Sequence, residues 1–345
     1  MPSFRLPAEW EPQDAVLLAW PHEHSDWAPM LNAIEPVIAH IVAVITRYER
    51  VVLIVPTGKE THVKQFLRIK NALLSRIVYV PMRTNDIWTR DYGPITVYSG
   101  KKPVMLDFSF NGWGRKHAAN LDNRATHTMH AGGSFPGAHH KTAAMVLEGG
   151  SIDSNGAGTI MTTAQCLREK RRNPLLSQTA IEKKLKTFLG ARSILWLNHG
   201  GLEGDDTDSH IDTLARFAPG NTILYVQCGN PRDVHYEGLQ AMESELKLYT
   251  TSRGTRYCLA GLPLPDPCFG RKNQRCPATY ANFLVINNAV LVPTYGQKRN
   301  DQIALARISM AFPKRKIIGI NCLPVIEQGG SLHCLTMQLP AGVLS

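Results

Sequence analysis

Short apolar segments rich in β-branched residues recur along the whole chain, and helical patterns lie between several of them. Segments of this kind are typical of buried strands. They lie at residues 15–20, 51–55, 77–80, 95–98, 104–108, 159–162, 193–197, 222–226, 283–286, 290–292 and 316–320. Helices are predicted at residues 27–48, with Asp26 as the cap, at 59–69, and at 177–189, with Gly190 as the stop. This alternation of strands and helices predicts an α/β fold.

A chain of 345 residues, 43% of them hydrophobic, can bury a large core and by length alone allows two or three domains. No Ser/Gly-rich linker, low-complexity tract or abrupt change of composition divides the sequence. The polar stretch at residues 115–140 is expected to be a long loop within a domain. We therefore expect a single domain that spans residues 1–345.

The seven cysteines are odd in number and lack paired C-x-x-C spacing, which argues against a disulfide framework and against a zinc ribbon. The N-terminal residues Met1 to Arg5 lack the basic segment and apolar run of a secretory signal. No apolar stretch is expected to approach the roughly 20 residues that span a bilayer. We expect a soluble, cytoplasmic protein with reduced thiols and no membrane partner.

The formal net charge of +10 suggests nucleic-acid binding as one function, because basic surface neutralises phosphates. The one dense basic run, at residues 168–172, is interrupted by Glu169, is followed by Pro174 and contains no aromatic side chains for base stacking. A solvated helix end or loop is expected there. Nucleic acid is therefore not expected as a partner, and a basic nucleic-acid-binding protein remains the alternative from a different functional class.

Four short segments carry side chains suited to nucleophilic and acid–base chemistry. Cys334 follows the glycine turn Gly329-Gly330 and stands at the mouth of a predicted strand. A thiol on such a turn can be presented to a substrate, whereas most cysteines are small core residues. The other segments lie at residues 88–94, with Trp88 and Asp91; at 147–152, with Glu148; and at 205–212, with His210 and Asp212.

The spacing within these segments predicts their local geometry. Asp91 precedes Gly93-Pro94 and is expected at a turn, where it either faces a cavity or pairs with Arg90. If residues 210–212 are extended, the side chains of His210 and Asp212 point to one face about 6.6 Å apart. Glu148 follows an apolar run, and a buried carboxylate there would need a cation or donor nearby.

Together these four segments, in this order, resemble the agmatine deiminase family of guanidine-modifying enzymes. The likeness extends to residues 6–12, 18–21, 110–114 and 279–283 and so covers nearly the whole chain. It implies a five-bladed α/β propeller of ββαβ modules around a pseudo-fivefold axis. It also implies hydrolysis of the guanidinium group of agmatine, a small molecule, to N-carbamoylputrescine and ammonia.

The chemistry of a guanidinium group explains why such residues are needed. Its carbon is a poor electrophile because the positive charge is spread over three nitrogens. Carboxylates can bind the N–H forks and fix the orientation, a thiolate can add to the carbon, and an acid–base group can protonate the departing nitrogen.

The resemblance assigns a role to each candidate residue. Cys334 would be the nucleophile, forming a covalent S-alkylthiouronium intermediate, and His210 the general acid and base. Asp91 and Asp212 would bind the guanidinium group, Glu148 would orient His210 and contact the substrate, and Trp88 would belong to the substrate-binding site. No cofactor and no metal are implied. Whether His210 or the cationic substrate stabilises the thiolate stays open, as does the oligomeric state, a homo-oligomer included.

Several observations favour other readings. The spacing Asp208-x-His210-x-Asp212 matches the metal-binding pattern of manganese-dependent ureohydrolases, although no second ligand cluster is evident. Ser209 and Ser331 stand where the family often has glycine. The basic residues 115–117 would repel the ammonium of agmatine if they line the pocket, and would favour free or peptidyl arginine. An amidinotransferase would share the cysteine and differ in the acceptor.

Overall fold

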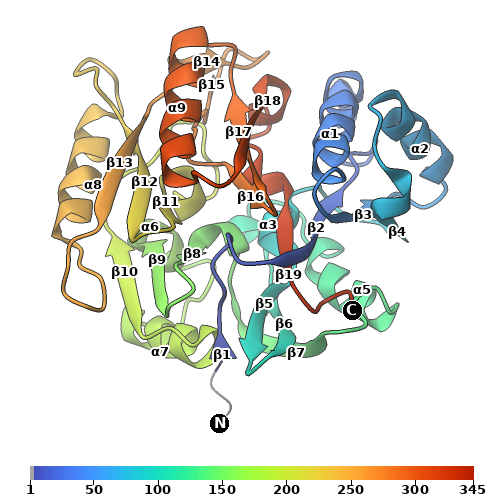
Figure 1. Ribbon diagram of the computed structural model, residues 1–345, viewed down its shortest axis with the longest axis horizontal. Helices are drawn as coiled ribbons and strands as arrows, with labels where there is room; N and C mark the ends of the chain where they lie inside the picture. Colours follow the sequence, from blue (N-terminus) through green and yellow to red (C-terminus); the bar gives the residue numbers. More distant parts are fainter. Residues whose placement is uncertain (1–3) are drawn as a thin grey trace.

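Small, separate sheets with helices between their strands make up the fold, so the predicted α/β class is confirmed (Figure 1). The computed structural model describes residues 4–345. Residues 1–3, on which the expectation of no signal sequence partly rests, lie outside the described residues.

One unit of three strands and a helix occurs five times in residues 4–345. An antiparallel pair is followed by a helix and then by a strand parallel to the second member of the pair. The units are β5 (Ile95–Ser99), β6 (Lys102–Ser109), α5 (Ala125–Ala131) and β7 (His139–Val146); β8 (Ile152–Ser154), β9 (Thr159–Thr163), α7 (Gln178–Leu189) and β10 (Ser193–Leu197); β11 (Ala215–Ala218), β12 (Thr222–Gln227), α8 (Tyr236–Leu248) and β13 (Cys258–Pro263); β16 (Leu284–Ile286), β17 (Ala289–Thr294), α9 (Lys298–Ala311) and β18 (Lys316–Asn321); and β19 (Met337–Pro340), β2 (Gln13–Ala19), α1 (Leu31–Ile45) and β3 (Arg50–Val55).

Other elements extend or connect these units. The strand β1 (Phe4–Arg5) pairs with β5, and β4 (Ile77–Pro81), which follows α2 (Glu60–Ile69), pairs with β3. A small hairpin joins β14 (Cys268–Phe269) to β15 (Arg275–Cys276). The short helices are η1 (Ala28–Met30), η2 (Leu74–Arg76), α3 (Thr89–Tyr92), α4 (Gly112–Arg115), η3 (Asp122–Arg124), η4 (Gly149–Ser151), α6 (Ala164–Leu167), η5 (Ile211–Thr213), α10 (Leu323–Ile326) and η6 (His333–Leu335).

All eleven predicted strands are present, and most of them, such as β2, β3 and β17, are buried on both faces, as continuous apolar runs indicate. Two long strands were not predicted: β13, although its residues Cys258–Pro263 are apolar, and β7, whose mostly exposed side chains leave no continuous apolar run. The helix α9 was missed for the same reason, since it buries only Ala304 and Ile308.

The helix boundaries agree with the predictions in part. Ser177 accepts a hydrogen bond from the backbone N–H of Ala180 at the start of α7, and Gly190, with φ of 68°, ends that helix as predicted. Asp26 is not a cap: η1 begins two residues after it, and α1 begins at Leu31 without a side-chain cap. The single helix predicted at 27–48 is therefore η1 followed by α1.

The expectation that no apolar stretch approaches the length of a membrane span is wrong. The segment Ala28–Ile45 has the length and composition that would allow one. More than half of it, 56%, is buried inside the protein. In the structure α1 packs against α2, α10 and β3. Burial against neighbouring elements accounts for its apolar character.

Residues 115–140 were expected to form one long loop, but η3, α5 and the start of β7 lie within them. Their polar composition concealed this structure. The carboxylate of Asp122 accepts hydrogen bonds from the backbone N–H groups of Asn85 and Asp86, which fixes the start of this stretch.

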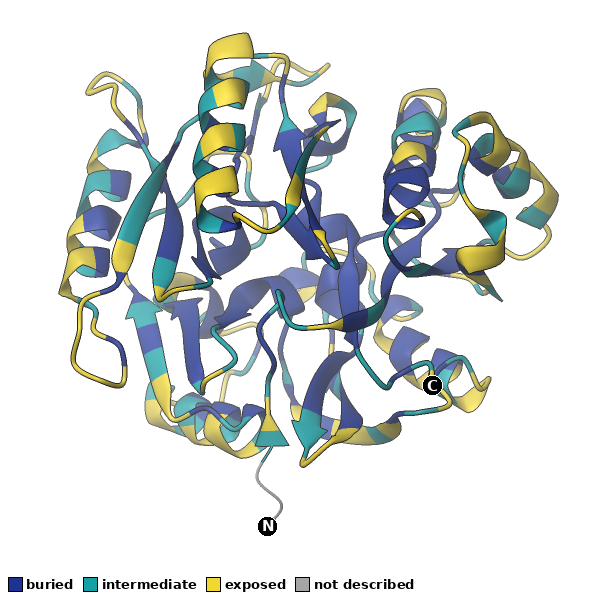
Figure 2. Cartoon of the chain, in the orientation of Figure 1, coloured by how far each residue is buried: buried dark blue, intermediate teal, exposed yellow. Residues whose placement is uncertain are grey.

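Pairing of β19 with β2 joins the two ends of the chain and completes the fifth unit. The five sheets lie around the middle of the molecule with their long helices outside, and burial is concentrated on the inner strands (Figures 1 and 2). The residues that immediately precede the first strand of each unit are consequently brought toward one another.

Candidate active site

The predicted site residues occupy equivalent places in the fold. Asp91 lies in α3 before β5, Glu148 before η4 and β8, and His210 and Asp212 at η5 before β11. Cys334 lies in η6 before β19. Contacts of α3 with η4 and η6, and of η4 with η5, bring these short helices together. The chain thus gathers in space residues that the sequence separates by more than two hundred positions.

Three side chains surround Gly150. The Nδ1 atom of His210 lies 3.6 Å from Oδ1 of Asp91, which also accepts a hydrogen bond of 3.0 Å from the backbone N–H of Gly150. A Cβ atom on Gly150 would lie 2.6 Å from Nδ1 of His210, 2.8 Å from Oδ1 of Asp91 and 3.1 Å from Oδ2 of Asp212. Only glycine therefore allows Asp91, His210 and Asp212 to approach this point together.

The thiol of Cys334 adjoins this group, with its Sγ atom 3.7 Å from Oδ2 of Asp212. Asn282, two residues before β16, holds the cysteine segment. Its Oδ1 accepts a hydrogen bond from the backbone N–H of His333 at 2.8 Å, and its Nδ2 lies 3.3 Å from Sγ of Cys334. Asn282 was not predicted as a site residue, although it lies in the segment 279–283 that supported the family resemblance.

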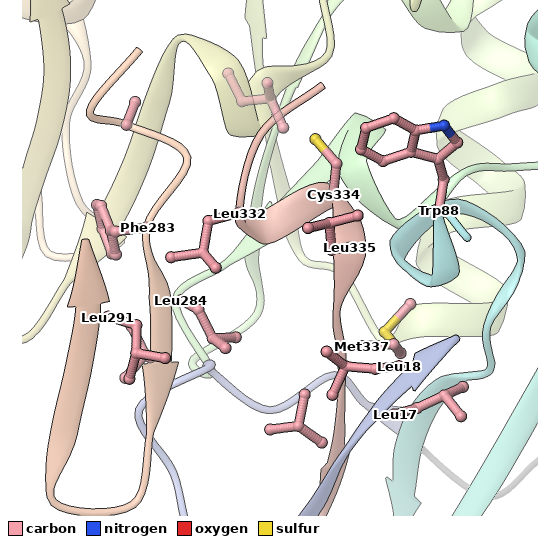
Figure 3. Packing of buried hydrophobic residues seen from close by; sticks show 14 of the residues in the cluster. Leu17, Leu18, Trp88, Phe283, Leu284, Leu291, Leu332, Cys334, Leu335 and Met337 are labelled. Atoms are coloured by element: carbon pink, nitrogen blue, oxygen red, sulfur yellow. The ribbon is translucent and has the colours of Figure 1, made fainter. Parts of the chain in front are cut away.

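A cavity of about 230 Å³ leads to Cys334 and Asp91. Trp88, which lies next to Cys334 in Figure 3, forms one wall, and the predicted glycine turn brings its backbone against that ring. Gly329 has φ of 82°, and a Cβ on Gly330 would lie 2.6 Å from the indole of Trp88. The lining residues are Asp26, Asp86, Trp88, Asp91, Trp113, His117, Asp206, Thr207, Glu327, Gln328, Gly329, Gly330 and Cys334.

Trp113 supports Asp91 from an unusual backbone conformation. Its φ is 54°, in the left-handed region, and its indole N–H donates a hydrogen bond of 2.9 Å to Oδ2 of Asp91. Together with the Gly150 N–H, this donor occupies both oxygens of Asp91. Arg90 turns away to Glu9 and Gln338, so the alternative in which Asp91 pairs with Arg90 is wrong.

His210 and Asp212 do not lie on an extended strand, and the same-face argument made from the sequence is therefore wrong. Asp208 and Ser209 both have left-handed φ values, 65° and 64°, and η5 begins at Ile211. The carboxylate of Asp205 accepts hydrogen bonds from the backbone N–H groups of Thr207 and Ser209, which stabilises this turn. The turn, rather than strand alternation, brings the two side chains together.

Glu148 has the cation that its burial requires. The Nε atom of Arg172 donates to both carboxylate oxygens at 2.8 and 3.1 Å, and Nη1 of Arg172 donates to Asp208 at 2.6 Å. Arg172 belongs to the basic run expected to be solvated, and that expectation is wrong for this residue, which is 3% exposed. No hydrogen bond joins Glu148 to His210 among the described residues, so its predicted orienting role stays a prediction.

Two sets of residues bear on metal binding at this site. Glu148, Cys166 and His210 place ligand atoms within 4.8 Å of one another, but Arg172 occupies both Glu148 oxygens and would repel a second cation. Asp208 turns to Arg172 and Lys116, whereas Asp212 turns to His333, so the Asp-x-His-x-Asp spacing does not converge on one ion.

Burial controls the protonation of the central groups. Desolvation lowers the pKa of His210 to about 3, despite the nearby charge of Asp212. Burial, followed by the charges of Asp212 and Asp91, raises the pKa of Cys334 well above its usual value. Burial also raises the pKa of Asp91. Burial acts the same way on Asp212, but the hydrogen bond from His333 and the charges of His333, His210 and Arg216 together outweigh it and lower the pKa of Asp212. The site at neutral pH holds a neutral imidazole and a protonated thiol.

Two of the three basic residues 115–117 are paired with neighbouring acids. Lys116 lies 2.9 Å from Asp208 and 3.3 Å from Asp206, and His117 lies 2.7 Å from Asp206. Of these three residues only His117 lines the cavity. The expected repulsion of a substrate ammonium group is therefore weak.

Known proteins match this chain over nearly its whole length. The profile of the Porphyromonas-type peptidyl-arginine deiminase family matches residues 5–340. An agmatine deiminase from Medicago truncatula is 30% identical over 370 aligned positions, which cover 98% of this chain and 96% of the plant protein. A solved Porphyromonas gingivalis protein, provisionally named an arginine deiminase, is 45% identical, with a TM-score of 0.91 and coverage of 98% of this chain and 99% of its own.

A second solved structure is the agmatine deiminase of C. jejuni, a cysteine-to-serine variant with substrate bound. It is 38% identical, has a TM-score of 0.91 and covers 99% of this chain and 97% of its own. The chain therefore belongs to the Porphyromonas-type peptidyl-arginine deiminase family, which includes the agmatine deiminases, and is a hydrolase that acts on amidines.

Proposed function

We propose that this protein hydrolyses agmatine to N-carbamoylputrescine and ammonia through a covalent intermediate on Cys334. The observation that carries the proposal is the buried group of Asp91, His210 and Asp212 around Gly150, with the Cys334 thiol beside it. Two carboxylates, an imidazole and a thiol are the groups that deimination of a guanidinium requires.

Asp91 and Asp212 bind the guanidinium group in this proposal. The Oδ1 atom of Asp212 is buried without a hydrogen-bond partner among the described residues, and a guanidinium N–H would supply one. Trp113 and Gly150 hold the carboxylate of Asp91 in a fixed orientation. A bound cation would also lower the raised pKa of Asp91 by its charge.

The substrate itself activates Cys334, which favours one of the two routes left open by the sequence. In the empty site the thiol is protonated and His210 is neutral, so no thiolate–imidazolium pair forms there. A guanidinium between Asp91 and Asp212 offsets the negative charge that holds the thiol pKa high. Alkylation by the cationic reagent 2-chloroacetamidine should therefore be far less dependent on pH than alkylation by neutral iodoacetamide; equal pH dependence would rule out this route.

His210 moves protons in both halves of the reaction. The thiol proton passes to His210 as the sulfur adds to the guanidinium carbon, and His210 then protonates the departing nitrogen, which leaves as ammonia. Neutral His210 next takes a proton from water, which attacks the thiouronium carbon and expels the Cys334 thiolate. Both ring nitrogens of His210 lack hydrogen-bond partners among residues 4–345, which leaves them available for these transfers.

The far part of the cavity favours a cationic tail. Asp26, Asp86, Asp206 and Glu327 line it together with one basic residue, His117. Burial raises the pKa of Asp86 to about 6, so this carboxylate is mostly ionised at neutral pH and would attract an ammonium group. A carboxylate-bearing tail would meet unfavourable charge in the same place.

Deimination of free or peptidyl arginine is the second candidate, favoured by the name of the matching family and by the P. gingivalis relative. The two functions separate when agmatine, arginine and a peptide with C-terminal arginine are compared for ammonia and ureido product. We expect kcat/KM for agmatine to exceed the other two by at least about tenfold. A higher value for either arginine substrate would overturn the agmatine assignment.

We also propose how the five repeated units are arranged. The five repeated units would form a propeller with a pseudo-fivefold axis, and the chain would act as one catalytic domain in the cytoplasm, with no nucleic-acid partner. The equivalent placement of the five site segments supports this arrangement. Light scattering would give the oligomeric state, and a salt-dependent DNA affinity would contradict the absence of a nucleic-acid partner.

A further inference from the structure

A second group of ligand-bearing side chains lies between α5 and the strands β6 and β7, and none of its members lines the active-site cavity. Asp107 comes from β6 and His140 from β7, which pair in parallel with Met105 opposite His140 and Asp107 opposite Thr142. Asp107 and His140 therefore share one face of the sheet. Figure 1 shows α5 beside these strands.

The helix α5 directs a histidine toward this face. The ring of His127 packs edge-on against that of His140, with 5.4 Å between centroids. His130, one helical turn further on, lies 5.3 Å from the same ring, and its Nε2 is 3.0 Å from the carbonyl oxygen of Ala138. Three elements thus converge on His140.

The ligand atoms are close enough to share one ion. One nitrogen of His127, one nitrogen of His140 and one oxygen of Asp107 all lie within 4.8 Å of one another. The His140 nitrogen and the Asp107 oxygen are 2.9 Å apart, near the roughly 3.3 Å that separates two ligands of a tetrahedral ion with bonds of about 2.0–2.1 Å. Small rotations of exposed His127 would complete the set.

We propose that Asp107, His127 and His140 form a divalent metal site with the chemistry of zinc. Two imidazoles and one carboxylate are ligands that zinc prefers, and a fourth position would be open to water. The pair Asp107–His140 is already hydrogen-bonded without a metal, but His127 makes no side-chain hydrogen bond among the described residues. Metal binding would give His127 a partner.

The position of the site implies a structural role. The stretch from α4 to α5 begins at the cavity, where Trp113 bonds to Asp91 and His117 lines the wall, and ends at His127. Asp122 fixes its middle to Asn85 and Asp86. A metal bridging α5 to β6 and β7 would attach the far end of this stretch to the sheet and stabilise the folded chain.

Calorimetric titration with Zn²⁺ tests the proposal, on full-length protein first treated with chelator and dialysed. We expect the wild-type chain to bind one more zinc ion than His127→Ala or Asp107→Asn, and to gain a few degrees in Tm at saturating zinc. His127→Ala should fold, because His127 is an exposed helical residue and alanine favours helices.

His199→Ala is the matched control. His199 is exposed, as His127 is, and lies 3.1 Å from Glu245, but it belongs to no three-residue ligand group in residues 4–345. This variant should bind zinc as the wild type does. Equal zinc stoichiometry and affinity in wild type and His127→Ala, or no zinc binding by the wild type, would overturn the proposal.

Discussion

Two groups of buried ionisable side chains meet at Asp212 and differ in how fully they are paired. The proposed catalytic group, called the catalytic group below, consists of Asp91, His210, Asp212 and Cys334. The supporting group consists of Glu9, Arg90, Asp153, Arg216 and His333. All nine side chains are buried or nearly so, but hydrogen bonds are more complete in the supporting group than in the catalytic group.

In the supporting group every carboxylate and imidazole has a partner. Glu9 pairs with Arg90, Arg216 and His333, and its pKa lies well below the usual value, because these cations outweigh the effect of burial. Asp153 accepts from the backbone N–H groups of Ser154 and Phe217. Only the Nε atoms of Arg90 and Arg216 lack a hydrogen-bond partner in this group among residues 4–345. Pairing this extensive fixes the structure around Asp212.

In the catalytic group some of the partners are missing. Both ring nitrogens of His210 and the Oδ1 atom of Asp212 are buried without a hydrogen bond among residues 4–345. Burial in this state is costly, so such atoms mark a place where a ligand supplies the missing donors and charge. His333 connects the groups, with Nδ1 at 2.8 Å from Asp212 and Nε2 at 2.8 Å from Glu9. Rigid pairing on one side thus orients a carboxylate whose other oxygen is left for the substrate.

The largest effect is expected when the thiol of the catalytic group is removed. Cys334→Ser should fold normally and lose turnover by on the order of 10⁴-fold or more, because a hydroxyl cannot replace the thiolate nucleophile. Ammonia release and thermal unfolding measure the two properties. Exposed Cys258→Ser is the control and should keep near wild-type activity. More than a trace of turnover by Cys334→Ser would exclude the covalent mechanism.

The second-largest effect is expected when the ion pairs of the supporting group are broken. Glu9→Gln should lower the free energy of unfolding by about 3–5 kcal/mol, because Arg90 and Arg216 lose the charge that compensates their burial. Denaturant titration measures the loss. Glu23→Gln, which removes an exposed pair with Lys59, should cost less than about 1 kcal/mol. Similar losses in the two variants would mean that the supporting group does not stabilise the fold.

Crowding the catalytic group without changing its charges should have a smaller effect. Gly150→Ala should lower kcat/KM by roughly 10²-fold, since the added methyl displaces Asp91, His210 and Asp212 from one another. Steady-state kinetics with agmatine measure it. In α8, Gly238→Ala is the control, because nothing lies within 4 Å of its added Cβ. Unchanged kinetics for Gly150→Ala would show that the three side chains need not converge.

The smallest effect concerns pH. The pKa of His210 is about 3 in the folded state and roughly 6.5 when unfolded, so between these values the unfolded chain binds a proton that the native chain does not. Stability from this group is therefore lost as pH falls below about 6.5, by up to roughly 1.4 kcal/mol per pH unit.

His210→Gln should accordingly show a shallower loss of stability between pH 6 and pH 4 than the wild type. Denaturant titrations at several pH values measure the slope. Exposed His199→Gln should keep the wild-type slope. If His210→Gln follows the wild-type slope, the imidazole of His210 is not held neutral by burial.

Much of the local structure could be predicted from the sequence. Continuous apolar runs identified eleven strands, most of which are buried on both faces. Ser177 and Gly190 marked the ends of α7 because capping chemistry is local. The segments with Asp91, Glu148, His210 and Cys334 were also recognisable from neighbouring residues alone. The strand β7, whose side chains are mostly exposed, carried no comparable signal.

Tertiary structure decided what these segments do together. The need of Glu148 for a cation followed from its sequence, but only the fold shows that Arg172, in a run expected to be solvated, supplies it. The turn at Asp208 and Ser209, and the roles of Asn282 and His333, likewise depend on partners distant in sequence. Local patterns set backbone preferences, whereas burial, pairing and pKa depend on which residues the folded chain places within a few ångströms.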